Sequence, residues 1–281
     1  MQTWAWVFDF DGTIAQTFKP SPSGIGVNEA TRMAVGKIFG MPGLAVFDDL
    51  GGLRNKAPIE IINEIISKAS GLVWLARDTF ISLHFHGSEF ASGAGVPLIW
   101  PDSDNDIEGI VAVATELFVR AKMAIYISEI RMWPSGPWPA PCDGIVDCLN
   151  RIEKNSIPWA VLSSGHEVFI KKTFELWGAG HPEIMITDDD LRGSSLPLEK
   201  RFKPNEAIVQ FLLARWRQRE PRISNINMSQ VVYVGDDPNK DGHLARNAGT
   251  RFVWYNPNGL PLPSGGIAPD LEIRHYSELF P

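Results

Sequence analysis

Cysteine is scarce in this chain, and it has neither a long uncharged apolar run nor an excess of positive charge. Among 281 residues there are two cysteines, Cys142 and Cys148. This excludes a disulfide scaffold and favours a reducing compartment. The formal net charge of −7 argues against a general partner of nucleic acids or anionic membranes.

Membrane-spanning and secreted proteins are also disfavoured. The most apolar long stretch, residues 107–130, carries five charged side chains, so it does not fit a membrane span. Asp9 and Asp11 interrupt the first apolar run, which a signal peptide would not tolerate. We therefore expect a soluble, cytoplasmic protein, and the sequence leaves its oligomeric state open.

The order of apolar patterns predicts an α/β core interrupted by a helical insert. Short apolar runs of strand length occur at residues 157–163, 183–187, 230–236 and 251–256. Helical spacings alternate with these runs, which is typical of a parallel, doubly wound sheet covered on both faces. We predict a Rossmann-like core of residues 1–16 and 139–281, with a helical cap domain of residues 17–138 inserted after the first strand.

One part of the insert lacks helical spacing. Residues 84–106 show little periodicity and are predicted to form a loop that enlarges the cap. His84 and His86 within it suggest a metal site. No third ligand stands at a usable spacing, however, so we interpret both as loop residues.

Two carboxylates follow the first predicted strand, in the stretch WAWVFDFDGT at residues 4–13. Asp9 and Asp11 alternate, so they point to the same side, where their charges repel unless a cation lies between them. Asp236 and Asp237 end another predicted strand, and ligands bind at the carboxyl ends of parallel strands. Oxygen ligands alone select a hard ion, and Mg²⁺ is the usual choice beside phosphate.

This arrangement predicts nucleophilic catalysis on a phosphate ester. A metal-neutralised Asp9 can form an aspartyl phosphate. Asp11 would then protonate the leaving oxygen and deprotonate the hydrolytic water. Gly12 lets the chain leave the strand sharply, and Thr13 can present a hydroxyl or an amide to the phosphate.

Two further segments offer phosphate-binding groups. Ser163 and Ser164 stand between a strand and a helical pattern, where a hydroxyl and helix N-terminal amides make an anion site, although either serine could be a plain N-cap. Lys203 precedes Pro204, which we place at the first position of the next helix, so the lysine is aimed from a defined point. Lys200 and Arg201 are the alternatives to Lys203.

The segment DDPNKDG at residues 236–242 matches the first half of a calcium-binding EF-hand loop. Position twelve of that loop would be Ala248, where a bidentate glutamate is required, and a strand rather than a helix precedes it. We therefore predict Asp236 as a direct metal ligand, with Asp237 and Asp241 in supporting roles.

Taken in order, these motifs resemble those of the haloacid dehalogenase superfamily, in its phosphatase branch with a helical cap, which includes phosphoglycolate phosphatase and β-phosphoglucomutase. They are D-x-D-G-T at 9–13, Ser163, Lys203 before a proline, and G-D-D-x-x-x-D at 235–241. The resemblance covers the core, about half of the chain.

The resemblance implies a Mg²⁺-dependent phosphatase for a small organic phosphate. Asp9 would be the nucleophile and a metal ligand, and Asp11 the acid and base that lends its backbone carbonyl to the metal. Asp236 would be the third protein ligand, and Asp241 would hold a metal-bound water. Dehalogenases of the family lack an acid at the position of Asp11.

Three other functions remain open: a phosphomutase with the same core, a glycosidase that uses Asp9 and Asp11 as its carboxylate pair, and a catalytically silent binding protein. Residues 50–62 resemble the loop that caps of sugar-phosphate-acting relatives place over the active site. Arg54 or Lys56 could therefore contact a substrate carboxylate or a second phosphate. The alternative is a solvated loop.

Overall fold

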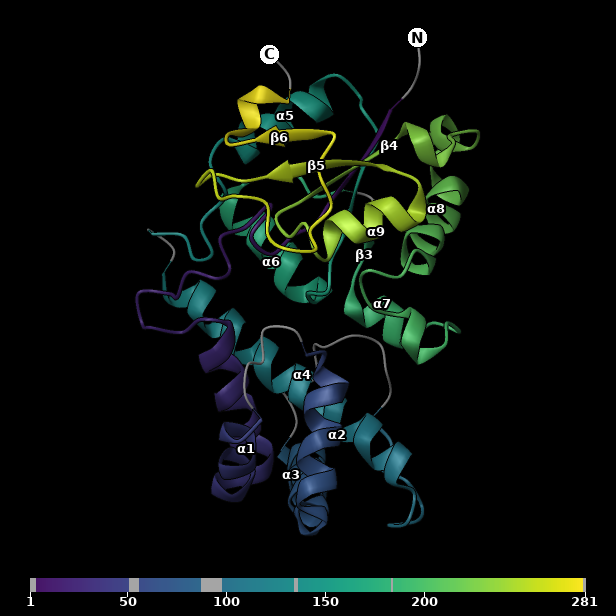
Figure 1. The fold of residues 1–281 in the computed structure, drawn as a ribbon. Helices are drawn as coiled ribbons and strands as arrows, with labels where there is room; N and C mark the ends of the chain where they lie inside the picture. The colour runs from purple at the N-terminus through teal and green to yellow at the C-terminus, as the bar shows by residue number, and fades with distance from the viewer. Residues whose placement is uncertain (1–3, 51–55, 87–97, 134–135, 183, 280–281) are drawn as a thin grey trace. The chain divides into compact units, whose positions relative to one another are not determined.

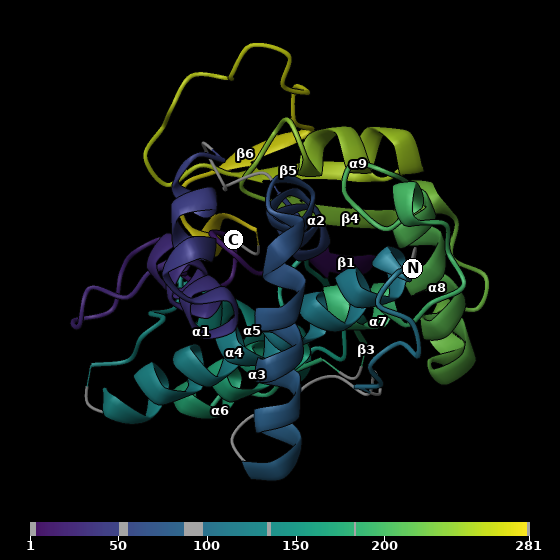
Figure 2. The same ribbon diagram turned by 90° about the horizontal axis from the view of Figure 1, so that it is seen from below.

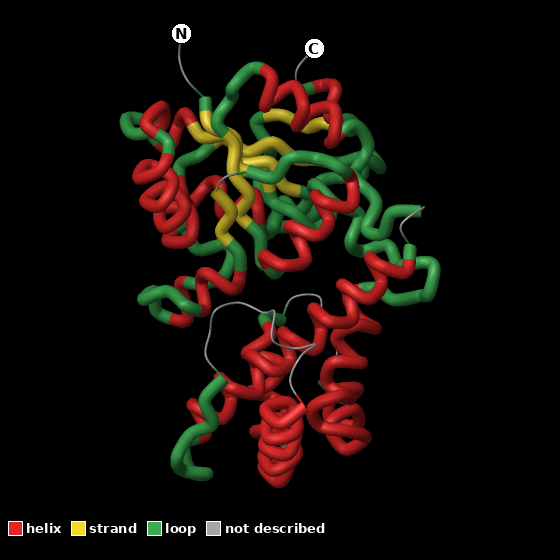
Figure 3. Tube along the Cα trace, turned by 180° about the vertical axis from the view of Figure 1, so that it is seen from behind, coloured by secondary structure: helices red, strands yellow, loops and turns green. Residues whose placement is uncertain are grey.

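The computed structural model describes residues 4–50, 56–86, 98–133, 136–182 and 184–279. The chain forms two compact units: Met1–Lys19 with Ser135–Pro281, and Pro20–Pro134. Figure 3 shows strands and helices in the first unit, which we call the α/β unit. It shows helices in the second, which we call the helical unit. Within the described ranges, no helix is both long and apolar enough to cross a membrane.

A parallel sheet organises the α/β unit. Its strands are β1 (Ala5–Phe8), β2 (Trp159–Leu162), β3 (Ile184–Ile186), β4 (Val231–Gly235), β5 (Arg251–Tyr255) and β6 (Leu271–Ile273). They are ordered β3-β2-β1-β4-β5-β6, and all neighbours are parallel. Figure 2 shows the order from β6 to β1. The central strand β1 therefore lies between β2 and β4, where the strand order reverses.

The α/β unit has helices on both faces of this sheet. They are α5 (Ile145–Lys154), α6 (Glu167–Trp177), α7 (Asp188–Arg192), α8 (Ala207–Arg219) and α9 (Asp241–Ala248). Leu212 of α8 and Leu244 of α9 share one buried apolar cluster with Val7 and Tyr233. On the opposite face, Phe174 of α6 packs on Trp159 of β2 and on Phe10, which follows β1. Figures 1 and 2 show α8 and α9 on one side of the strands and α5 and α6 on the other.

This architecture confirms the predicted fold class. The four apolar runs that follow the insert form β2 to β5, each slightly shorter than predicted. Strand β6 was not predicted because it has only three residues, of which the first two are exposed, so no apolar run marks it.

The helical unit contains α1 (Val27–Asp48), α2 (Pro58–Lys68), α3 (Val73–His86) and α4 (Ile107–Met132). Helix α1 is kinked at Gly40, whose φ is 60°. Buried isoleucines lie on one face of α2, at Ile61, Ile62, Ile65 and Ile66. Such an apolar stripe is the usual cause of a helix packing against its neighbours.

The predicted loop at residues 84–106 is partly wrong. His84 and His86 belong to the last turn of α3. The residues of this helix do not repeat at one helical spacing, which is why the sequence did not predict its last turn. Residues 87–97 of this segment lie outside the described part of the chain, and residues 98–106 form neither a helix nor a strand.

Candidate active site

The sheet topology brings three segments to one edge. Asp9 directly follows β1, and its backbone N–H donates to the carbonyl of Val234 at 2.9 Å. Ser163 follows β2, and Asp236 follows β4. Because β2 and β4 are the two neighbours of β1, these residues lie at adjacent carboxyl ends of parallel strands, where such folds bind their ligands.

Lys203 joins two of the acids. Its Nζ lies 2.6 Å from Oδ1 of Asp9 and 2.8 Å from Oδ1 of Asp241. Burial raises the pKa of Asp9 to about 7. Lys203 opposes this rise, whereas Asp241 and Asp11 add to it. Burial alone would lower the pKa of Lys203, but Asp241 and Asp9 hold it well above its ordinary value. The ammonium therefore stays charged.

Three carboxylates form a candidate metal centre. One oxygen each of Asp9, Asp236 and Asp241 lies within 4.8 Å of the other two. Burial, and then Asp241 and Asp9, raise the pKa of Asp236 well above its usual range. The raised pKa values of Asp9 and Asp236 mean that Lys203 alone does not offset the charge of this group. A divalent cation would let these acids stay ionised. Oxygen ligands alone fit Mg²⁺.

This cluster differs from the predicted ligand set. Asp241, predicted in a supporting role, lies beside Asp9 and Asp236 as a candidate direct ligand. The side chain of Asp11 is not part of the group, and the predicted use of its backbone carbonyl stays a prediction. Sequence reasoning could not rank Asp241 because the turn between Asp236 and α9 decides how far its carboxylate reaches.

Local hydrogen bonds shape that turn. The carboxylate of Asp237 accepts from the backbone N–H of Asn239 at 2.8 Å and of Lys240 at 3.2 Å, as in an Asx-turn. The backbone N–H of Asp237 donates to Oδ2 of Asp241 at 3.2 Å. Trp254 of β5, which sequence reasoning missed, donates through Nε1 to the carbonyl of Asp236 at 3.0 Å.

Two glycines let the acids come close. A Cβ on Gly12, whose φ is +77°, would lie 2.4 Å from Oδ2 of Asp236. A Cβ on Gly235 would lie 2.3 Å from Oδ2 of Asp241. Thr13 is fully buried, and its hydroxyl donates to Oδ1 of Asp236 at a long 3.5 Å. The lack of a side chain at Gly12 and Gly235 therefore lets Asp236 and Asp241 approach the backbone. The positive φ of Gly12 agrees with the sharp turn predicted there.

The Ser163 segment forms a turn rather than a helix cap. The Ser163 hydroxyl accepts from the backbone N–H of Gly165 at 2.8 Å. Helix α6 begins at Glu167 and is preceded by His166, so neither Ser163 nor Ser164 is its N-cap and that alternative is wrong. A Cβ on Gly165 would lie 3.1 Å from Oγ of Ser163 and 3.2 Å from Oδ2 of Asp11. The turn therefore brings Asp11 beside Ser163.

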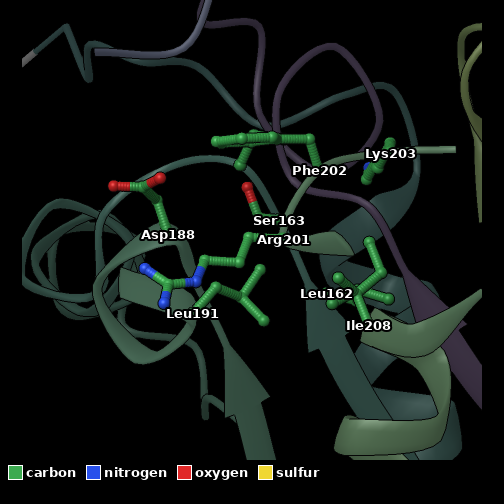
Figure 4. A pocket seen from close by; sticks show the side chains of 9 residues that line it. Leu162, Ser163, Asp188, Leu191, Arg201, Phe202, Lys203 and Ile208 are labelled. Carbon is green, nitrogen blue, oxygen red and sulfur yellow. The ribbon is translucent and has the colours of Figure 1, made fainter. Parts of the chain in front are cut away.

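The same turn borders a small cavity. Figure 4 shows Ser163 between Asp188 on one side and Phe202 and Lys203 on the other. Ser163 is buried and Ser164 is exposed, although both line the cavity. Ser163 and Lys203 therefore both line one small cavity.

Lys203 reaches the acids by a route that differs from the prediction. Helix α8 begins at Ala207, so Pro204 lies in the preceding turn and not at the first helical position. The Lys203–Pro204 peptide bond is cis. Arg201, an alternative phosphate binder, instead donates to the carbonyls of Arg192, Ser194 and Leu196. Lys200 is exposed.

A second buried charge network supports the Ser163 turn. Nδ1 of His166 lies 2.9 Å from Oδ1 of Asp189, whose other oxygen accepts from the backbone N–H of Glu167 at 2.9 Å. Arg192 contacts Asp188 at 2.7 Å and also Asp189 at 2.5 Å. Burial would raise the pKa of Asp189, but His166 and Arg192 lower it to about 2. Arg192 pairs with both carboxylates of this group, which with His166 also stand close enough together to hold a metal ion.

The two predicted specificity residues belong to the helical unit. Lys56 forms an ion pair with both carboxylate oxygens of Glu64 at 2.8 Å and donates to the carbonyl of Leu50 at 3.4 Å. Arg54 lies outside the described residues. Their role toward a substrate stays a prediction.

The fold and this site define a hydrolase of the doubly wound α/β class. Residues 5–249 match the model of the haloacid dehalogenase-like hydrolases, so the chain belongs to this family. No curated protein sequence matches the chain.

Solved structures share its fold. CbbY from Rhodobacter sphaeroides, solved as a variant in complex with xylulose-(1,5)bisphosphate, aligns with a TM-score of 0.50 and 17% identity over 99% of this chain and 96% of that one. A haloacid dehalogenase-like phosphatase from Thermococcus onnurineus aligns with a TM-score of 0.47 and 19% identity, with the same coverage. At these identities the likeness concerns the fold alone.

Proposed function

We propose that the protein is a Mg²⁺-dependent phosphatase that hydrolyses a small organic phosphate monoester through an aspartyl phosphate on Asp9. The observation that carries this proposal is the position of the Lys203 ammonium, 2.6 Å from Asp9 and 2.8 Å from Asp241, at the end of the central strand. Nucleophile, phosphate-binding cation and candidate metal ligands thus share one buried site.

The reaction has two steps. Asp9 attacks phosphorus in line with the ester bond, and Asp11 protonates the leaving alkoxide as the P–O bond breaks. Asp11 then deprotonates a water that attacks the phosphorus of the aspartyl phosphate. This releases inorganic phosphate and restores the Asp9 carboxylate.

The remaining residues stabilise charge on the transferring group. Lys203 binds its oxygens as a point charge, and the Ser163 hydroxyl supplies a hydrogen-bond donor. Asp9, Asp236 and Asp241 would hold the Mg²⁺ ion, which supplies positive charge next to the phosphoryl oxygens when bound. The helical unit, with Arg54 and Lys56, is our candidate for choosing the substrate.

A panel of phosphorylated metabolites, assayed for phosphate release with and without Mg²⁺, tests the proposal. We expect release for at least one small phosphomonoester and its loss in EDTA. Asp9→Asn should reduce the rate at least about a thousandfold, because the amide is no nucleophile. Asp147→Asn, a change at an exposed acid of α5, is the matched control and should keep the wild-type rate.

Other outcomes identify the alternatives. An Asp9→Asn variant that retained most activity would refute the aspartyl phosphate. Isomerisation of an aldose 1-phosphate without phosphate release would indicate a phosphomutase. Hydrolysis of a glycoside at a rate that EDTA does not change would favour a glycosidase. A protein with no activity and no Mg²⁺-dependent thermal shift with beryllofluoride would be a silent member of the fold.

A further inference from the structure

A buried tyrosine lies beneath the charged groups of the site. Tyr233 is fully buried in β4 and pairs in register with Val7 of β1. Both side chains belong to the apolar cluster that α8 and α9 cover. Side chains two residues apart in a strand point to the same face of the sheet. Tyr233 therefore lies on the same face as Val7, and Val7 on the same face as Asp9 two residues later.

The Tyr233 hydroxyl reaches two parts of the site. It lies 3.2 Å from the carbonyl oxygen of Leu162, the last residue of β2 before Ser163, and 3.4 Å from Oδ1 of Asp241. Both distances are long for a hydroxyl donor, as expected where one proton is shared between two acceptors. Because β1 separates β4 from β2 in the sheet, the phenol spans the central strand.

The aromatic ring also faces the lysine. Nζ of Lys203 lies 5.4 Å from the centroid of the Tyr233 ring, within the range of a cation–π contact. Lys203 donates to the same Oδ1 of Asp241 that the Tyr233 hydroxyl approaches. One side chain thus contacts the strand end that carries Ser163, the candidate ligand Asp241 and the phosphate-binding Lys203.

We propose that Tyr233 is a positioning residue that fixes Lys203 and Asp241 relative to the Ser163 turn, so that the phosphate-binding groups are preorganised before substrate arrives. The surrounding cluster is apolar, so packing alone would be satisfied by phenylalanine. A tyrosine hydroxyl buried without partners would be costly. Here its partners are the candidate ligand Asp241 and the carbonyl of the residue before Ser163. Preorganised donors contribute most where charge develops in the transition state.

The test compares Tyr233→Phe with Tyr255→Phe. Tyr255 lies in the adjacent strand β5 and is 3% exposed, so its variant also removes one hydroxyl from a buried ring of the same sheet. The kinetic arm rests on the proposed function. With saturating Mg²⁺, Tyr233→Phe should lower kcat about tenfold and change KM less than about threefold. Tyr255→Phe should keep kcat, and both variants should have similar thermal midpoints.

A kcat for Tyr233→Phe within twofold of wild type would overturn the inference, as would a loss of kcat matched by Tyr255→Phe. A crystal structure of Tyr233→Phe tests the positioning role without any measurement of activity. If the wild-type protein had no phosphatase activity, only the proposed function would be refuted. We expect the Asp241 carboxylate, which loses its contact with the Tyr233 hydroxyl, to shift so that the Lys203 ammonium no longer contacts both Asp9 and Asp241. If it kept both contacts, Tyr233 would have only a packing role.

Discussion

Gly12 shows how much of this site depends on a missing side chain. Its positive φ and the 2.4 Å approach of Asp236 to a Cβ at that position exclude an L-residue without movement of the carboxylate. Gly24 also has a positive φ, of +84°, but nothing lies within 4 Å of a Cβ there. A substitution at Gly24 therefore tests backbone strain alone, whereas one at Gly12 also displaces Asp236, a candidate metal ligand.

We predict that Gly12→Ala lowers phosphatase activity more than tenfold and the free energy of unfolding by about 1–3 kcal/mol. Gly24→Ala should lower the free energy of unfolding by about 1 kcal/mol and leave activity unchanged. Urea denaturation and steady-state kinetics of both variants measure this. Equal activities in the two variants would show that the carboxylate tolerates displacement.

At the level of helices and strands, the Asp189 network holds α7 to the β2–α6 turn. Asp189 is 9% exposed, and its pKa of about 2 lies below the ordinary value of 3.8 for an aspartic acid. A carboxylate with a depressed folded-state pKa stabilises the fold above its unfolded pKa. That contribution is lost as the pH falls from about 4 through about 2.

We predict that Asp189→Asn lowers the free energy of unfolding at pH 7 by about 2 kcal/mol, the equivalent of the pKa shift. The difference from wild type should shrink by about half near pH 3, because the wild-type carboxylate is then protonated in the unfolded state. Denaturant titrations at both pH values measure it. A difference independent of pH would mean that packing, rather than charge, links α7 to the turn.

The sequence pattern predicted some helices and strands more clearly than others. Strands β2 to β5 are buried along nearly their whole length, so continuous apolar runs marked them. Helix α3 and strand β6 carry no such pattern. The rule that proline often begins a helix placed the start of α8 at Pro204. The helix begins three residues later, because Lys203 and Pro204 belong to the turn before it.

The whole chain crosses between its two units twice, and the two crossing segments pair inside the α/β unit. The backbone N–H of Gln16 donates to the carbonyl of Ala140 and that of Cys142 to the carbonyl of Ile14, both at 2.9 Å. Trp138 donates through Nε1 to the carbonyl of Lys19 at 2.8 Å. Hydrogen bonds within the α/β unit therefore hold together the two points at which the chain leaves and re-enters it.

We predict that replacing residues 20–134 by a short Gly-Ser linker leaves an α/β unit that unfolds cooperatively, since a short loop costs little entropy where its ends already meet. Circular dichroism during thermal unfolding measures this, with the full chain as the reference. A broad, non-cooperative transition would show that the helical unit is needed for folding. The predicted boundaries of the two domains, at residues 16/17 and 138/139, would then need revision.

Lys203 was predicted from the proline that follows it and from the order of the family's motifs. The residues alone indicated the α/β sheet, the helical insert, and Asp9, Ser163 and Asp236 as neighbours in space. These inferences follow from short-range regularities: burial periodicity, and the rule that parallel strands end at a common edge. Each acts within a strand or the few residues after it, so one sequence is enough to recognise it.

Other features needed the folded chain. Asp241 as a candidate ligand, the ammonium of Lys203 between two acids, the support from Trp254, and Tyr233 spanning the central strand all join segments far apart in the sequence. Such contacts depend on how turns place side chains across neighbouring strands, to within a fraction of an ångström. No local pattern of residue types encodes that distance, because it results from the packing of the entire α/β unit.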